Sequence, residues 1–291
     1  MTNDILTIGH GLGGLCLLNT APCRRDTVHA AADAVGYGRL VPAVPARTTV
    51  LRAAIEETAA LMYGKRRKQP IRVHLTAEQN AFEAVRIVTR QAKNDHQFLF
   101  SASIDTQWNV DVLDWDTQSA SISRYVLRDK VEHLCVAMRD TLPASTVGQI
   151  AVKMLRDWKA LPLLDNGGAW FLPGPRIEDY RAFAGRLAGS GPRFNITTFE
   201  IASDPDTVMH VLDRLHAEVT AGMQEIMADV MEASGGMADR SINVRLDRAN
   251  VFLDKVYTYE RLLGKPLPDL TDAIEQVKQA VAVNRLLSAA V

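Results

Sequence analysis

The stretch DPDTVMHVLDRLHAEVTAGMQEIMADVME, residues 204–232, decides most of the fold. Asp204 is a favourable N-cap residue and Pro205 suits the first helical position, so a helix is predicted to begin here. Its apolar residues recur at close to the 3.5-residue spacing of a coiled-coil seam: Val208, Leu212, Leu215, Val219, Ile226 and Val230. A long amphipathic helix is therefore expected, ending at Ser234-Gly235-Gly236.

Two more helices follow with short breaks between them. Phe252, Val256 and Tyr259 mark the first, which Gly264 ends, and a second apolar stripe runs on from Leu270. Short connections make neighbouring helices antiparallel, so residues 204–291 are predicted to form a long-helix bundle or an antiparallel coiled-coil arm. The seam residues that could pack either within the chain or against a partner are Leu212, Leu215, Val219 and Ile226.

The front of the chain, residues 1–127, carries a different pattern. The first 47 residues are interrupted by glycine and proline, and an irregular path is expected there. A helix is predicted from Thr48 to Gly64, and a second from the capping box at Thr76. Residues 96–126 alternate with a period of two and predict a three-stranded antiparallel meander. A phase slip between Val112 and Leu113 indicates a bulge.

Residues 128–203 predict a helical pair, a short hairpin, a short helix and a strand. The hairpin is indicated by LLDNGGAWFLP, residues 163–173, with its turn at Asp165-Asn166-Gly167-Gly168. Taken together, the three regions predict an α+β fold: a small antiparallel sheet with flanking helices, and a bundle of long helices behind it.

Composition and charge indicate an ordinary cytoplasmic protein. The 291 residues are 47% hydrophobic and 23% charged, with no apolar run of membrane-spanning length and no signal-peptide pattern at the start. Three cysteines do not suggest a disulfide framework. The net charge of −1 divides into +5 over residues 1–100 and −6 over the rest. The N-terminal part of the chain is therefore mildly basic, and the helical C-terminal part is acidic.

Two motifs near the start invite a cofactor or metal hypothesis. Residues 9–14, GHGLGG, match the dinucleotide pattern G-x-G-x-x-G formally, but Pro22 leaves too short a helix after them. His10, Cys16, Cys23 and His29 are soft metal ligands, yet their spacing of five to six residues lacks the close pairs of common zinc sites. No cofactor is predicted.

Carboxylates on the meander offer the enzyme hypothesis. Asp105 and Asp116 open turns, where aspartate caps its own backbone, so Asp111 and Asp114 are left as the candidate catalytic pair. No catalytic triad order, phosphate loop or zinc-protease motif accompanies them. Enzymatic activity is the least supported reading.

The one dense charge run is Lys65-Arg66-Arg67-Lys68, with Arg72 close behind it. Such a run can contact nucleic-acid phosphates. A basic tail at a helix C-terminus is equally well explained by the helix dipole. Aromatic residues that would stack bases are missing around it.

The motif GGAWFLP, residues 167–173, followed by a capped long helix, resembles a Gly-Gly-aromatic-Phe-Val-Pro strand found in proteins of phages, plasmids and their bacterial hosts. The resemblance covers about the second half of the chain. It implies a phage or mobile-element setting and carries no catalytic residues with it.

The leading hypothesis is thus a non-enzymatic interaction or assembly protein that associates with itself or with another protein through its long C-terminal helices, away from any membrane. The alternative is a nucleic-acid-associated accessory protein that uses the basic run at residues 65–68. An enzyme that uses the meander carboxylates comes third.

Overall fold

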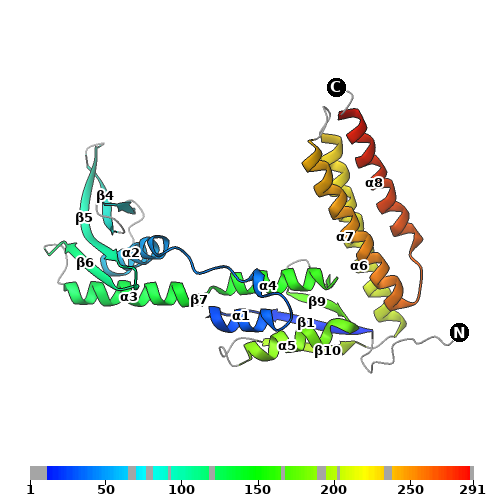
Figure 1. Ribbon diagram of the computed structural model, residues 1–291, viewed down its shortest axis with the longest axis horizontal. Coiled ribbons are helices and arrows are strands. Elements are labelled where there is room, and N and C mark those ends of the chain that lie inside the picture. The colour runs from blue at the N-terminus through cyan, green and yellow to red at the C-terminus, as the bar shows by residue number, and fades with distance from the viewer. Residues whose placement is uncertain are drawn as a thin grey trace. The chain divides into compact units, whose positions relative to one another are not determined.

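The computed structural model describes residues 12–64, 70–76, 81–90, 93–117, 122–164, 168–188, 195–201, 204–232 and 238–288. The chain divides into two compact units, each drawn in Figure 1. One, called here the sheet–bundle unit, comprises Met1–Ala21, Ala30–Gly38 and Ala144–Val291. The other, the meander unit, comprises Pro22–His29 and Arg39–Pro143. The fold is α+β, as predicted from the sequence.

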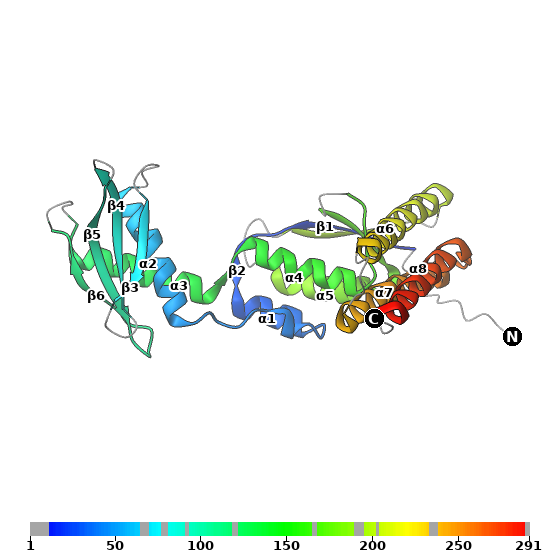
Figure 2. The same cartoon turned by 90° about the horizontal axis from the view of Figure 1, so that it is seen from above.

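The meander unit is built on a four-stranded antiparallel sheet in the order β3-β4-β5-β6. Two helices cover one face of this sheet (Figure 2). The core between them includes Leu51, Ile55, Phe100 and Val131, all buried. The elements of this layer are β3 (Ile71–Leu75), β4 (Ala81–Arg90), β5 (Lys93–Ile104), β6 (Val110–Trp115), α2 (Arg47–Tyr63) and α3 (Arg124–Asp140).

The helix predicted from Thr76 is wrong, because residues 81–90 form strand β4. Phe82, Val85 and Val88 sit three residues apart, which suggested one helical face. Pairing of β4 with both β3 and β5 outweighs that local signal. A bulge interrupts the β4–β5 pairing: Ala84 lies opposite Phe100 and Val85 opposite Phe98, so Leu99 of β5 is the extra residue. Tertiary pairing thus decided the structure of this segment.

The three-stranded meander is also corrected. Its predicted last strand, around Val126, belongs instead to helix α3, whose N-cap Ser123 accepts a hydrogen bond from the Val126 N–H. The bulge is confirmed: Ser101 pairs with Asp114 and Ala102 with Val112, so Leu113 is the extra residue.

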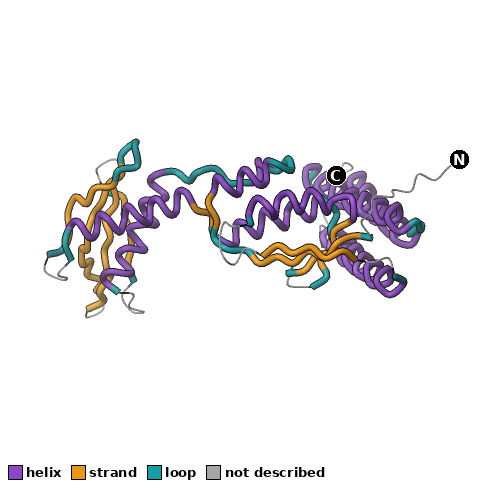
Figure 3. Tube along the Cα trace, turned by 90° about the horizontal axis from the view of Figure 1, so that it is seen from below, coloured by secondary structure: helices purple, strands orange, loops and turns teal. Residues whose placement is uncertain are grey.

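The sheet–bundle unit contains a second four-stranded sheet, in the order β10-β1-β9-β8, with helices alongside the strands (Figure 3). Residues 13–19, expected to be irregular, form its strand β1. Only glycine fits at position 13, because an added Cβ would lie 2.4 Å from the Leu172 carbonyl oxygen. The β8–β9 pair confirms a hairpin in this segment, but its first strand is Leu161–Pro162, just before the predicted range of 163–173, and residues 165–167 of the predicted turn lie outside the described residues. These elements are β1 (Gly13–Asn19), α4 (Ala144–Asp157), β8 (Leu161–Pro162), β9 (Ala169–Pro173), α5 (Ile177–Leu187) and β10 (Asn195–Ile201).

The three C-terminal helices pack together as predicted. They are α6 (Pro205–Glu232), α7 (Asp239–Leu263) and α8 (Pro268–Ser288). Asp204 caps α6 by accepting a hydrogen bond from the Thr207 N–H at 2.9 Å, and Gly264 ends α7 in the left-handed conformation. Helices α6 and α7 approach closely where Gly222 meets the ring of Phe252: a Cβ on Gly222 would lie 2.2 Å from Cζ.

The remaining described elements are short: α1 (Arg25–Asp33), the 3-10 helices η1 (Gly38–Leu40) and η2 (Gly174–Arg176), and the paired strands β2 (Cys23–Arg24) and β7 (Thr141–Leu142). Within the described ranges, none of the helices combines the length and apolar character needed to cross a membrane.

Candidate binding cleft

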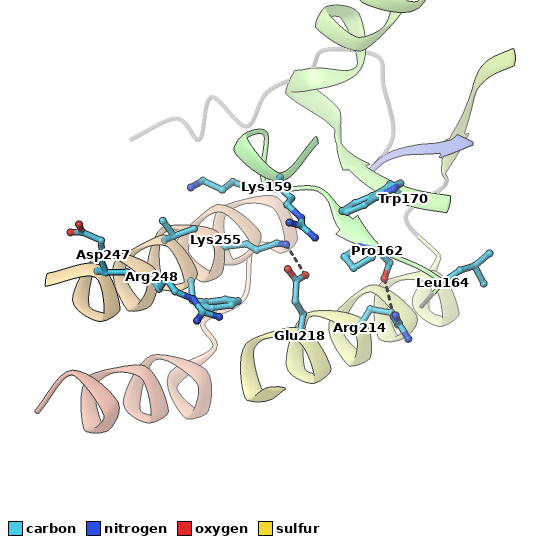
Figure 4. A pocket seen from close by; sticks show the side chains of 13 residues that line it. Lys159, Pro162, Leu164, Trp170, Arg214, Glu218, Asp247, Arg248 and Lys255 are labelled. Atoms are coloured by element: carbon cyan, nitrogen blue, oxygen red, sulfur yellow. Dashed lines mark hydrogen bonds and ion pairs between the residues drawn. The ribbon is translucent and has the colours of Figure 1, made fainter. Parts of the chain in front are cut away.

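A cleft of about 850 Å³ lies in the sheet–bundle unit, between the β8–β9 hairpin, the end of α4 and the helices α6 and α7 (Figure 4). Its size is within the range of sites that hold one small molecule. Each wall contributes a different chemistry: the hairpin an apolar edge, the end of α4 two cations, and the helix pair a buried ion pair.

The hairpin is divided between the core and the cleft by strand alternation. Leu161 and Phe171 lie opposite each other in the β8–β9 pair and belong to the same buried core as the α6 seam. The next pair along, Pro162 and Trp170, lines the cleft. Because successive side chains of a strand point to opposite faces, one two-residue strand both anchors the bundle and forms a cleft wall.

Lys255 is the central polar residue of the cleft. Its side chain is only 6% exposed, and Nζ donates to Glu218 Oε2 at 2.7 Å and to the Ala160 carbonyl oxygen at 2.8 Å. Figure 4 shows Lys255 and Glu218 pointing toward each other from α7 and α6. Burial lowers the pKa of Lys255, and the Glu218 carboxylate opposes that effect. The ammonium group is thereby held in a fixed position between the two helices.

Four more cations line the cleft. Arg156 and Lys159 come from the end of α4 and the turn after it. Arg214, on α6, donates from Nε to the Pro162 carbonyl oxygen at 3.0 Å, which orients its guanidinium along the hairpin. Arg248, on α7, forms an ion pair of 2.8 Å with Glu225. Against these five cations the lining holds two acids, Glu218 and Asp247.

Helix α7 also presents apolar side chains at the cleft. Val244 and Val251 are 51% and 54% exposed and stand two turns apart, so they lie on one face of the helix. Phe252 is half-buried beside them. The cleft therefore combines a charged interior with an apolar rim.

The seam residues singled out from sequence pack inside the chain. Leu215, Val219 and Ile226 are fully buried in the core shared by α6, α7 and α8, and Leu212 is half-buried against it. A partner would therefore have to use another face of the bundle.

The candidate nucleic-acid residues are only partly described. Residues 65–68 lie outside the described part of the chain. Arg72 is exposed on β3, an edge strand of the meander sheet. Arg72 does not line the cleft.

The candidate carboxylates lie exposed on β6. Asp111 forms an ion pair of 3.0 Å with Arg124, and Asp114 Oδ1 accepts from the Trp115 N–H at 2.8 Å. Neither lines the cleft. Both carboxylates have structural partners.

The candidate metal ligands are separated from one another by element. Cys16 is buried in β1, Cys23 is buried in β2, and His29 lies on α1, whereas His10 is outside the described residues. Burial raises the pKa of Cys16 to about 12, which disfavours the thiolate that a metal would need. In the ranges that the structure describes, no group of three or more His, Cys, Asp or Glu residues could hold a metal ion.

The cleft residues themselves were missed by the sequence-based predictions. They come from three segments of chain, around residues 156–170, 214–218 and 244–255, that no local pattern connects. One signal was available: Lys255 lies between Phe252 and Tyr259 on an otherwise apolar helical stripe, and a charge there calls for a buried partner.

Comparison with known proteins places the chain in a family. Residues 17–291 match the model of a family of unknown function, DUF6744, and the chain belongs to that family. No curated protein and no solved structure matches it.

Proposed function

We propose that this member of the DUF6744 family is a non-enzymatic assembly protein that associates with a second copy of itself through its long C-terminal helices. The observation that carries the proposal is the pair Val244 and Val251. The apolar seam of the bundle is complete within the chain, yet α7 keeps these two valines more than half exposed on one face. Burying them against the same strip of another copy would give a two-fold, self-complementary contact.

Native mass spectrometry tests this proposal. The wild-type protein is expected at a multiple of the 32.0 kDa chain mass, and the double variant Val244→Asp/Val251→Asp at 32.0 kDa. Its melting temperature should be unchanged, because both side chains reach solvent in the single chain. The matched control is Val283→Asp, a 55% exposed valine on α8, which should assemble like the wild type. A wild-type protein that stays monomeric at every concentration would end the proposal.

The inner seam gives a contrasting variant. Leu215 is fully buried, so Leu215→Asp places a charge in the bundle core and should unfold the helices rather than merely separate copies. Circular dichroism distinguishes the two effects, since loss of assembly alone leaves the helical signal in place.

The second candidate function is a nucleic-acid accessory role. The observation that favours it is the exposure of Arg72 on an edge strand, four residues after the basic run at residues 65–68. Binding to a labelled oligonucleotide should weaken steeply with salt, and replacing the four basic residues with alanine should flatten that dependence. Binding that ignores both changes would rule the role out.

The proposed setting is the cytoplasm of a host cell, on a phage or other mobile element. The motif at residues 167–173 supports the mobile-element setting, and three free, buried cysteines support a reducing compartment. Genes of phage structure or plasmid maintenance beside the coding sequence are the expected finding, and a conserved housekeeping neighbourhood would contradict it.

A further inference from the structure

The cleft lining has an excess of positive charge, although the helical bundle that forms most of the cleft has a net negative charge. Residues 204–291 carry 14 Asp and Glu against 9 Lys and Arg, a net charge of −5. The cleft lining nevertheless holds five cations and two acids. A local excess of positive charge on an acidic element attracts anions into a concave site, where field lines concentrate.

Hydrogen bonds hold two of the five cations of the cleft in position. Arg214 and Lys255 are oriented by main-chain carbonyl oxygens of the turn and hairpin that form the opposite wall, Pro162 and Ala160. Arg156 and Lys159 lie close enough to Lys255 to repel its ammonium group, because both contribute to lowering its pKa, after burial as the main cause. Glu218 is engaged with Lys255, and at the α4 end Lys159 forms a long ion pair of 3.8 Å with the exposed Asp254.

The apolar part of the lining determines what else the ligand must carry. Apart from the two valines assigned to self-association, Phe252 on α7 lines the cleft together with Pro162 and Leu164 of the hairpin side. A bare inorganic anion would leave these side chains in contact with water. A ligand with a flat apolar body would cover them while its anionic groups reach the arginines and lysines.

From this combination we infer that the cleft binds a phosphorylated small molecule of the nucleotide class. Its phosphates would contact Arg156, Lys159 and Arg214, and its ring system would lie against Phe252 and the hairpin side of the cleft at Pro162 and Leu164. Several cations from separate elements match several phosphate oxygens, and arginine offers the planar fork that suits phosphate. The inference goes beyond self-association and does not depend on it.

Isothermal titration calorimetry with ATP, inorganic tripolyphosphate and a thymidine oligonucleotide tests the site. ATP should bind and tripolyphosphate should bind more weakly, because it lacks the apolar body. The variant Arg156→Gln/Lys159→Gln should weaken ATP binding by about tenfold or more, since charge-assisted hydrogen bonds are lost. The apo melting temperature of this variant should match the wild type.

The matched control is Arg240→Gln/Lys265→Gln, which removes two exposed positive charges of the bundle away from the cleft lining and should leave ATP binding unchanged. Absence of ATP binding would overturn the inference. So would equal affinity for tripolyphosphate, which would remove the role of the apolar wall. An oligonucleotide that binds more tightly than ATP and is weakened by the cleft variant would overturn the small-molecule assignment in favour of a nucleic-acid strand.

Discussion

Each unit of the chain buries one basic side chain, and the surroundings of the two differ. In the meander unit Arg86 is 6% exposed, and its guanidinium donates to the carbonyl oxygens of Tyr63 and Gly64 at the end of α2. In the sheet–bundle unit Lys255 is 5% exposed and is held by a carboxylate beside an open cleft. Among the described residues these are the two buried charged side chains.

The difference separates a structural charge from a charge at a site. Arg86 donates to carbonyl groups that the last turn of any helix leaves without partners, so its buried guanidinium supports the end of α2. Lys255 caps no helix of its own, and it joins α6, α7 and the turn before the hairpin at the place where further cations gather. Burial of charge does not by itself mark a binding site, and Lys255 differs from Arg86 in lying at the wall of a cleft lined by further cations.

The largest expected effect comes from Glu218→Ala. This change leaves the Lys255 ammonium group buried without its carboxylate, and removal of one partner of a buried pair costs about 3 kcal/mol. Urea denaturation followed by circular dichroism should show that loss in the free energy of unfolding. A loss below about 0.5 kcal/mol would mean that the pair behaves like a surface salt bridge.

The double variant Glu218→Ala/Lys255→Met is the control for this effect. It removes the buried charge along with its partner, so it should be more stable than Glu218→Ala alone. If the double variant is instead the less stable of the two, the ammonium group contributes through the Ala160 carbonyl rather than through Glu218.

A smaller effect is expected from Arg86→Met. The substitution removes the hydrogen bonds to the end of α2, but Gly64 is exposed and water can replace the guanidinium there. The expected loss in the free energy of unfolding is about 1–2 kcal/mol. Hydrogen exchange should locate that loss at the last turn of α2. Protection lost uniformly over the whole meander sheet would show that Arg86 supports more than the helix end.

The sequence predicted the bundle better than the meander sheet, for a physical reason. Asp204 caps α6 through Thr207, Gly264 ends α7, and Leu215 and Val219 are one helical turn apart on the seam. Each of these signals acts over a few residues of its own helix, so cap and periodicity agree with the final structure. Residues 81–90 are different. Their strand is specified by pairing with β3 and β5, which a local pattern does not contain.

The cleft was less accessible to prediction than either region. Its lining depends on how the β8–β9 hairpin meets α6 and α7. Leu161 and Phe171 share one core with buried residues of these helices, which lie far along the chain from the hairpin. Trp170 and Pro162 line the cleft only because their neighbours face the core. Lys255 alone carried a readable signal, as a charge on an apolar stripe.

The smallest expected effect is a difference between Lys255 and Arg86 in how their contributions to stability depend on pH. Burial lowers the pKa of Lys255 below the 10.5 of an unfolded lysine. In the window just below pH 10.5 the unfolded chain therefore holds more protons at this residue than the folded chain does. Stability contributed by Lys255 should rise with pH across that window, because the penalty of burying its charge disappears there. Arginine stays protonated throughout, so Arg86 should contribute no such slope.

Tyr259 also makes the stability depend on pH in the alkaline range. Burial raises its pKa well above 10, so its contribution to stability is lost as pH rises past the pKa of unfolded tyrosine. Its hydroxyl donates to the Lys159 carbonyl oxygen in the folded chain. The measurement is therefore a difference: the free energy of unfolding of wild type minus that of Lys255→Met, from pH 8 to about 10.5. Tyr259 cancels in this difference, which should grow in favour of wild type as pH rises. A flat difference would mean that Glu218 balances the desolvation of Lys255 fully, and the distinction between the two buried cations would then rest on the cleft alone.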